Sequence, residues 1–238
     1  PTRLPGTRLG VLMPDDGVPV VAAVGAIGPD KGARRIECLV ERMRALDVPL
    51  RIVVIGYLDV EQGPWQSDDA RLTVHGRYDA RDLAALLRHY RAQLVLFPSA
   101  GPETFSYTLS ESWLAGVPAL VPPIGALAER VSETGAGWLL GDDEWIDEAK
   151  MLARVVALTG PAGAAARSAA ASKALDVSHA SPQSMADATL VRYGEAIAIE
   201  ARANVPRQPF GNRRVREALG YRPWSPPAVQ TPLAASSC

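Results

Sequence analysis

Residues 18–32 read VPVVAAVGAIGPDKG. The first seven are apolar or Pro and rich in Val, and Gly25 follows them. A short β-branched run that ends at a glycine is typical of a strand buried on both faces. The next residues, from Lys31 to Leu46, place apolar side chains at helical spacing. This stretch therefore predicts a strand followed by a helix, the repeating unit of a parallel α/β sheet.

The same pattern continues to about residue 140. Further short apolar runs occur at residues 50–55, 72–75, 94–97, 118–121 and 138–140, and helical patterns occur at 80–90, 108–115 and 127–133. Residues 57–70 show no helical pattern, so we expect one irregular crossover. The alternation predicts a Rossmann-like α/β fold, with a parallel sheet and helices on both faces.

The chain divides into three parts by its composition. We expect a leader or linker at residues 1–17, and a Rossmann-like domain with trailing helices at residues 18–201. Those trailing helices are expected at 142–158, 164–174 and 182–201. Residues 202–238 contain six Arg, six Pro and one acidic residue, Glu217, and this composition predicts an extended or disordered tail.

The overall composition is that of a soluble globular protein. The 238 residues are 47% hydrophobic and 21% charged, and the formal net charge is −1. So even a balance gives no overall attraction to nucleic acid, and we expect no nucleic-acid partner. Two cysteines, Cys38 and Cys238, imply no disulfide framework and favour a reducing compartment. We expect a cytoplasmic protein; the Arg-rich tail leaves peripheral contact with the inner face of a membrane open.

Ligands of open parallel sheets bind beyond the carboxyl ends of the strands. The first loop there contains Gly25 and Gly28, which permit close approach of the backbone to a ligand. Lys31 lies at the positive end of the following helix, and a bound phosphate would remove that electrostatic conflict. The alternative is a Gly-Pro turn with a solvated lysine, since neither G-x-x-x-x-G-K-[ST] nor G-x-G-x-x-G is present.

The second loop carries two carboxylates, Glu103 and Glu111, eight positions apart. Eight helical residues span about 12 Å, roughly the reach from a sugar across a diphosphate to a ribose. A helix N-terminus lies between the two carboxylates, and its N–H groups suit phosphate. The alternative is structural, because Thr108 and Glu111 also fit the S/T-x-x-E capping box.

The third loop is His75-Gly76-Arg77-Tyr78. Gly76 permits a tight turn, after which the backbone and Arg77 are placed to meet the edge of a nucleobase. A buried structural histidine and a solvated arginine are the alternative interpretation.

Together the three loops resemble the donor-binding half of retaining glycosyltransferases of the GT-B fold, in the family-four-like group known as glycosyl transferases group 1. That family carries G-x-x-x-x-[DE]-K-G, matched here by 25–32, and P-S followed by E-x-F-G-x-x-x-x-E, matched by 98–111. A later G-x-P-V is matched through Gly116 and Pro118. The resemblance covers residues 18–140 and implies the C-terminal half of a GT-B enzyme.

The resemblance also implies roles for individual residues. Glu103 would contact the donor sugar near its anomeric carbon, Lys31 would neutralise the leaving diphosphate, and Glu111 would bind the ribose hydroxyls. The remaining donor-binding residues would be Gly25 and Gly28 in the first loop, Ser106, Tyr107, Thr108 and Leu109 around the phosphates, and Gly76 and Arg77 beside the base.

The implied reaction is transfer of a sugar, of the hexosyltransferase type, from a nucleotide-sugar with retention of configuration. The resemblance suggests polysaccharide or glycan biosynthesis and implies no metal and no other cofactor. A glycan or lipid-linked acceptor would be bound by an N-terminal domain. Because the sequence begins at Pro1 without a Met, we expect the catalyst to be incomplete without that domain.

Three positions depart from the family pattern. Ala26 stands where the family usually has a phosphate-binding Arg, Ser106 stands where it has Gly, and Ser112 stands where it has Ala. These departures keep a second hypothesis open, that of a non-catalytic nucleotide-binding or interaction module of the same fold. A sugar epimerase or phosphorylase on this fold is a third hypothesis, although no Schiff-base lysine is evident.

Overall fold

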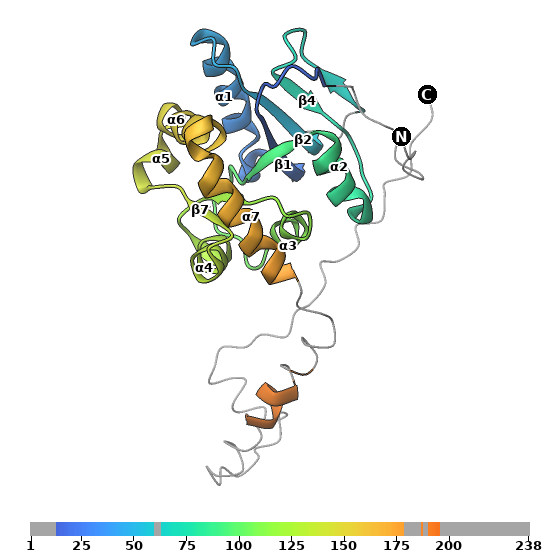
Figure 1. The fold of residues 1–238 in the computed structure, drawn as a ribbon, viewed down its shortest axis with the longest axis vertical. Helices are drawn as coiled ribbons and strands as arrows, with labels where there is room; N and C mark the ends of the chain where they lie inside the picture. Colours follow the sequence, from blue (N-terminus) through green and yellow to red (C-terminus); the bar gives the residue numbers. More distant parts are fainter. Residues whose placement is uncertain (1–12, 60–62, 179–186, 188–189, 196–238) are drawn as a thin grey trace, which may run out of the picture. The chain divides into compact units, whose positions relative to one another are not determined.

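The computed structural model describes residues 13–59, 63–178, 187 and 190–195 (Figure 1). The chain forms two compact units, residues 1–181 and 182–238. The first contains the whole sheet. In the second, the described residues are helical, and Arg192 forms an ion pair with Glu195 at 3.1 Å. The helix expected at 182–201 is thus described only in part, and the tail at 202–238 lies outside the described residues.

One seven-stranded sheet has the order β3-β4-β2-β1-β5-β6-β7. Every neighbouring pair is parallel except β3 and β4, which are antiparallel. The strands are β1 (Val20–Ile27), β2 (Arg51–Leu58), β3 (Trp65–Gln66), β4 (Leu72–Val74), β5 (Ala92–Leu96), β6 (Ala119–Val121) and β7 (Gly137–Leu139). The six strands predicted from apolar runs are therefore confirmed.

Two details of the sheet differ from the sequence-based expectation. β1 and β2 each continue two residues past a glycine expected to end them, Gly25 in β1 and Gly56 in β2. β3 was not predicted, because two residues are too short to show a periodic pattern. The irregular crossover between β2 and β4 is confirmed, since the described residues of 57–70 contain β3 and turns in place of a helix.

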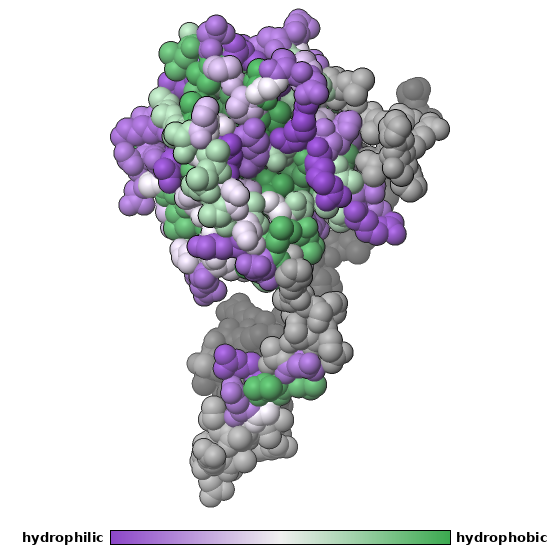
Figure 2. Space-filling view, in the orientation of Figure 1, coloured by the Kyte–Doolittle hydropathy of each residue, from purple (hydrophilic) through white to green (hydrophobic). Residues whose placement is uncertain are grey.

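Helices cover both faces of the sheet, as predicted (Figure 1). They are α1 (Ala33–Ala45), α2 (Leu83–His89), α3 (Tyr107–Leu114), α4 (Gly125–Thr134), α5 (Asp142–Ile146), α6 (Glu148–Thr159) and α7 (Ala164–Ser178). Buried side chains of α1 and α6 form the core on one face. Those of α2, α3, α4 and α7 form the core on the other. On the face of this unit that Figure 2 shows, hydrophilic and hydrophobic residues are interspersed.

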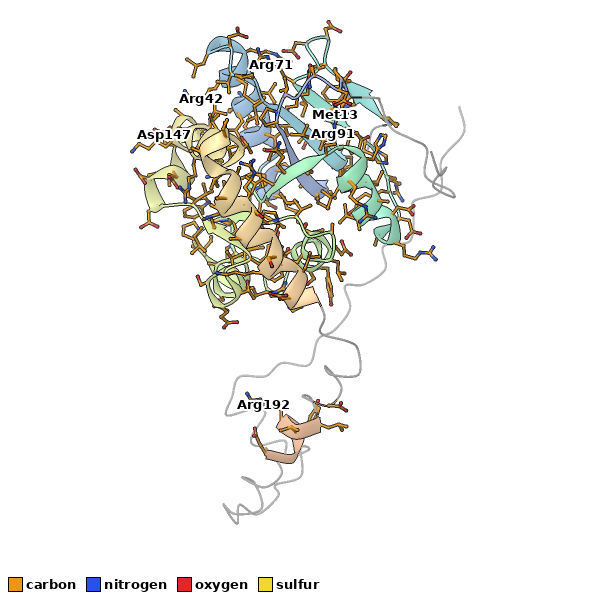
Figure 3. The ribbon with its side chains drawn as sticks, in the orientation of Figure 1. Met13, Arg42, Arg71, Arg91, Asp147 and Arg192 are labelled. Carbon is orange, nitrogen blue, oxygen red and sulfur yellow. The ribbon has the colours of Figure 1, made fainter. Side chains whose placement is uncertain are left out.

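The single helix expected at 142–158 is wrong, because the chain breaks at Asp147, which lies between α5 and α6 in Figure 3. Asp147 has an extended backbone, and its carboxylate accepts hydrogen bonds from the N–H groups of Ala149 and Lys150. An aspartate that caps a new helix N-terminus ends the preceding helix. The acidic residues between 142 and 148 favour the N-terminus of one helix in the sequence, whereas in the structure they lie at the N-termini of two, α5 and α6.

Two arginine–aspartate pairs attach the segment before β1 to the sheet. Arg51 donates two hydrogen bonds to the carboxylate of Asp16, at 2.6 and 2.5 Å. Arg91 pairs with Asp15 and donates to the Pro14 carbonyl at 2.8 Å, next to the start of the segment at Met13 (Figure 3). The pairing with Arg51 holds the pKa of Asp16 well below its usual range. The described end of the expected leader, residues 13–17, is therefore held against the domain.

β1 and β2 make their closest approach at two glycines. Gly25 of β1 lies beside Gly56 of β2, and their φ angles are 109° and 133°. Side chains avoid this backbone region, and a Cβ at Gly56 would overlap the carbonyl oxygen of Gly25. Only glycine at both positions allows the two strands to continue in register to Ile27 and Leu58.

We expect Gly56→Ala to destabilise the fold by about 3 kcal/mol or more, because steric overlap adds to backbone strain. Chemical denaturation of the purified protein measures the change. Gly63→Ala is the matched control, since a Cβ at Gly63 meets nothing within 4 Å. Equal stability of the two variants would contradict the close approach at Gly56.

His75 and Tyr90 form a buried polar pair beneath the third loop. Their exposed fractions are 2% and 1%, and His75 Nδ1 shares a hydrogen bond of 2.7 Å with the Tyr90 hydroxyl. Burial, and to a lesser degree the charge of His89, lowers the pKa of His75. Burial also raises the pKa of Tyr90 to about 12. The structural interpretation of His75 is therefore the one this geometry favours.

The lowered pKa of His75 predicts loss of stability on acidification. The unfolded chain takes up a proton near the ordinary histidine pKa, while the folded chain resists it, so stability falls as the pH drops below about 6.5. One proton contributes a slope of at most about 1.4 kcal/mol per pH unit. Denaturation curves between about pH 7.5 and 5.5 measure it. We expect His75→Gln to flatten this slope and His89→Gln to leave most of it.

Candidate functional site

An open pocket of about 450 Å³ lies at the carboxyl ends of β1 and β2. The backbone of Gly25 and Gly56 forms part of its wall, so the close approach of the two strands leaves space where side chains would otherwise stand. The other lining residues come from the ends of β1 and β2, from residues 77–80 and from α3: Ala26, Tyr57, Arg77, Tyr78, Ala80, Tyr107, Thr108 and Glu111. The first and third loops and α3 therefore meet at one place, as predicted from their positions after strands.

A second pocket of only about 10 Å³, room for about one water molecule, lies beside the first. It contains Lys31, Glu103 and Ser99, with apolar residues from β1 and β5 behind them. Thr108 lines both pockets, and its methyl group would contact a Cβ placed at Gly25, at 3.7 Å. The structure thus brings the Lys31–Glu103 pair and the Arg77–Glu111 pair to neighbouring pockets on either side of Thr108.

The N-terminus of α3 lines both pockets through Thr108. Ser106 is its N-cap residue and makes no capping hydrogen bond with its side chain. The first N–H groups of a helix have no partner within the helix, so those of Tyr107, Thr108 and Leu109 are suited to an anion. The Leu109 side chain is fully buried in the core, so its contribution is confined to the backbone. Tyr107, by contrast, is 76% exposed.

The capping-box interpretation of Glu111 is wrong. α3 begins at Tyr107 with Ser106 as its N-cap, so Thr108 is already inside the helix and Glu111 lies too far along it to cap. Glu111 instead lines the larger pocket, where burial raises its pKa. Burial and the nearby Glu111 charge also raise the pKa of Tyr78 to about 12. A partly buried carboxylate in a pocket is more consistent with ligand binding than with helix capping.

Gly28 and Gly76 support the loops from outside the pocket walls. Gly28 begins the 3-10 helix Pro29–Lys31, and its carbonyl accepts hydrogen bonds from the N–H groups of Lys31 and Ala33. Gly76 has φ 86° and donates to the Gly56 carbonyl at 2.8 Å. The N–H groups of Lys31, Gly32 and Ala33 are engaged within this turn, and Lys31 supplies the positive charge of the first loop.

The sequence did not single out several residues that line the pockets. Ser99 is 3% exposed, and its hydroxyl has no hydrogen-bond partner among the described residues. A buried hydroxyl without a partner is costly, and Ser99 lines the same pocket as Lys31 and Glu103. Tyr57 has no sequence signal, because an aromatic residue after a strand resembles any core residue, whereas Tyr78 belongs to the third loop but had no role of its own.

Neither a metal-binding cluster nor a membrane-spanning helix occurs among the described residues. Residues 13–59 and 63–178, with the few described beyond them, contain no group of three or more His, Cys, Asp or Glu that could hold a metal ion. Over the same part of the chain, each helix is too short or too polar to cross a bilayer. The expected lack of a metal remains a prediction.

The fold is that of a Rossmann-like α/β domain, with two pockets at the carboxyl edge of its sheet. The family described as "Glycosyl transferases group 1" matches residues 18–159, more than half of the chain. The chain therefore belongs to this family of glycosyltransferases.

Solved structures share the fold at low sequence identity. Sucrose-phosphate synthase from Thermosynechococcus elongatus matches with a TM-score of 0.56 and 20% identity over 78% of this chain and 47% of that one. A UDP-forming α,α-trehalose-phosphate synthase from Burkholderia vietnamiensis matches with a TM-score of 0.55 and 17% identity, over 80% of this chain and 46% of that one. Anabaena HepE in complex with UDP matches with a TM-score of 0.51 and 21% identity, over 73% of this chain and 48% of that one. These likenesses establish the GT-B-type fold.

The aligned part covers about half of each of these structures. No curated protein sequence matches the chain.

We expect Glu111→Gln to raise the thermal stability of the ligand-free protein at neutral pH. Because burial raises the pKa of Glu111, the folded state favours the protonated carboxyl, and stability contributed by this group falls as pH rises above the ordinary glutamate range. Thermal unfolding measures the change. Glu133→Gln, at an exposed residue of α4, is the control. A lower melting temperature for Glu111→Gln, with no change for Glu133→Gln, would instead favour a structural role for the Glu111 carboxylate.

Proposed function

We propose that this chain is the donor-binding half, the C-terminal half, of a retaining GT-B glycosyltransferase. The observation that carries the proposal is the placement of two pairs, Lys31 with Glu103 and Arg77 with Glu111, in neighbouring pockets beside the N-terminus of α3. A nucleotide-sugar has the same order of parts: a sugar, a diphosphate and a nucleoside. Membership of the family and the UDP complex of one structural relative support this assignment.

Each part of the donor has a group in the chain that suits it chemically. Glu103 would accept hydrogen bonds from the hydroxyls of a sugar bound at the mouth of the smaller pocket, which is too small to enclose it, and Lys31 would lie against the diphosphate. The N–H groups at the start of α3 would hold the phosphate oxygens. Glu111 would accept hydrogen bonds from the two ribose hydroxyls, with the base against Arg77 and Tyr78 in the larger pocket.

The chemical step breaks the bond between the anomeric carbon and a diphosphate oxygen, and the electron pair leaves on the diphosphate. The oxygen of the acceptor hydroxyl bonds to the same carbon and gives up its proton to the leaving diphosphate. Negative charge therefore grows on the diphosphate in the transition state. Lys31 and the α3 amides stabilise that charge with fixed positive groups, which is the largest effect that the chain offers to the reaction.

The remaining parts of the proposal concern the whole enzyme. A glycan or lipid-linked acceptor would be bound by an N-terminal domain, and the reaction would need no metal or other cofactor. We place the enzyme in the cytoplasm, with peripheral contact at the inner face of the membrane and a role in polysaccharide biosynthesis.

A non-catalytic nucleotide-binding module is the second candidate. Ala26 favours it, because this residue lines the larger pocket at the position where the family has a phosphate-binding Arg. Binding of a nucleotide with no sugar transfer by the full-length protein would favour this module over the enzyme.

Nucleotide binding is the direct test of the proposed site. We expect one of UDP, GDP or ADP to raise the melting temperature, since a ligand at 100 times its Kd adds about 2.7 kcal/mol of stability. Lys31→Ala should weaken binding of that nucleotide about tenfold or more, because it removes a charge-assisted contact with the diphosphate.

Lys150→Ala is the matched control. Lys150 is an exposed lysine that pairs with Asp143 at 2.9 Å, away from both pockets. The Lys150→Ala variant should bind the nucleotide with the affinity of the unaltered protein. Failure of all three nucleotides to shift the melting temperature would overturn the proposed function.

A further inference from the structure

An arginine on α4 holds the loop that leads into α3. Arg130 Nη1 donates hydrogen bonds to the carbonyls of Phe105, at 2.8 Å, and Ser106, at 3.0 Å. Its Nη2 donates to the Ser110 hydroxyl at 2.8 Å, one turn into α3. The guanidinium carbon also lies 4.4 Å from the centre of the Phe105 ring and 5.0 Å from that of Trp113. One side chain therefore contacts the loop, the N-cap residue and the first turn of α3.

The residue that Arg130 holds has an unfavourable backbone conformation. Ser106 has φ 66° and ψ 90°, in a region that residues with a Cβ rarely occupy. Such a conformation persists only where the surroundings hold it. The Ser106 side chain supplies little of that support, since it makes no capping bond and only contacts the Thr108 hydroxyl at 3.2 Å.

The start of α4 makes a second contact with the same loop. The Ala126 N–H donates to the Glu103 carbonyl at 3.1 Å. Gly125 has φ 66°, and a Cβ there would lie 2.8 Å from Pro102 Cβ and 3.0 Å from the Glu103 carbonyl oxygen. α4 therefore packs directly against the backbone of both Glu103 and Ser106, the two ends of this short loop.

We propose that Arg130 is a positioning residue for the donor site, which holds Ser106 in a glycine-like conformation and thereby orients Glu103 and the amides of α3. This inference rests on the proposed function for the identity of the ligand. Ser106 stands where the family resembled by the sequence has Gly, which adopts a positive φ without strain. Arg130 lines neither pocket, so it acts through the backbone.

This role predicts a specific coupling between two residues. Without Arg130, Ser106 relaxes from its strained conformation, and the first turn of α3 shifts with it. With Gly at position 106, the loop keeps its shape with less help, so the loss of Arg130 should matter less. An arginine that only stabilises the fold would show no such dependence on residue 106.

The test compares R130A, S106G and the double variant with the unaltered protein. The probe is whichever of UDP, GDP and ADP gives the largest thermal shift, and calorimetric titration gives its Kd. We expect R130A to weaken binding about tenfold, because it removes three hydrogen bonds from a charged group, and to weaken it about threefold or less when S106G is present. Hydrogen exchange of residues 103–109, measured without nucleotide, should be faster in R130A.

R167A is the matched control. Arg167 Nη1 likewise donates to two backbone carbonyls, those of Leu158 and Gly160, but at the end of α6. R167A should lower the melting temperature while leaving nucleotide affinity and exchange at 103–109 unchanged.

Two results would overturn the inference: unchanged exchange and affinity in R130A, or an equal loss of affinity with Ser and with Gly at position 106. If the unaltered protein binds no nucleotide, the proposed function fails and the positioning role for a donor fails with it. The exchange data then still decide whether Arg130 holds the loop, so the two failures are told apart.

Discussion

The close approach of β1 and β2 at Gly25 and Gly56 is the constraint on which the rest of the site depends. A Cβ at Gly56 would overlap the carbonyl oxygen of Gly25, and side chains avoid the φ of 109° at Gly25, so glycine at both positions lets the strands run on to Ile27 and Leu58. Both glycines also form part of the wall of the larger pocket, which Thr108 of α3 lines as well. Strand pairing and the binding surface thus have one physical cause.

Two helices, α3 and α4, then position the groups at this edge of the sheet. α3 supplies the helix N-terminus and Glu111, and α4 fixes the entry to α3 through Ala126 and Arg130. Neither α4 contact reaches the pockets, yet both determine the backbone that lines them. Such indirect support is expected where a site depends on backbone amides, because their direction follows the loop conformation.

Local patterns predicted most of the fold. The apolar runs give the six longer strands, and helical spacing gives α1, α2 and α3, because burial against the sheet selects these periodicities. Short elements escaped prediction: β3 is two residues long, and Asp147 divides one acidic helix into two. The candidate site was also predicted in outline, since loops after parallel strands share one edge of the sheet. Tyr57 has no pattern that separates it from a core residue, and Ser99 and Tyr78 stand in the quoted motifs without a role that the motifs assign to them.

The sequence by itself determined the α/β class, the family and the three loops that could hold a ligand, because these depend on periodicity and on motifs of nearby residues. Only the tertiary structure decided between the two interpretations of Glu111, since the start of α3 at Tyr107 depends on packing and not on the capping pattern. It also joined Arg130 to Ser106, which are 24 positions apart. Residues on different helices meet through packing against a common sheet, and no local pattern in a single sequence records that contact.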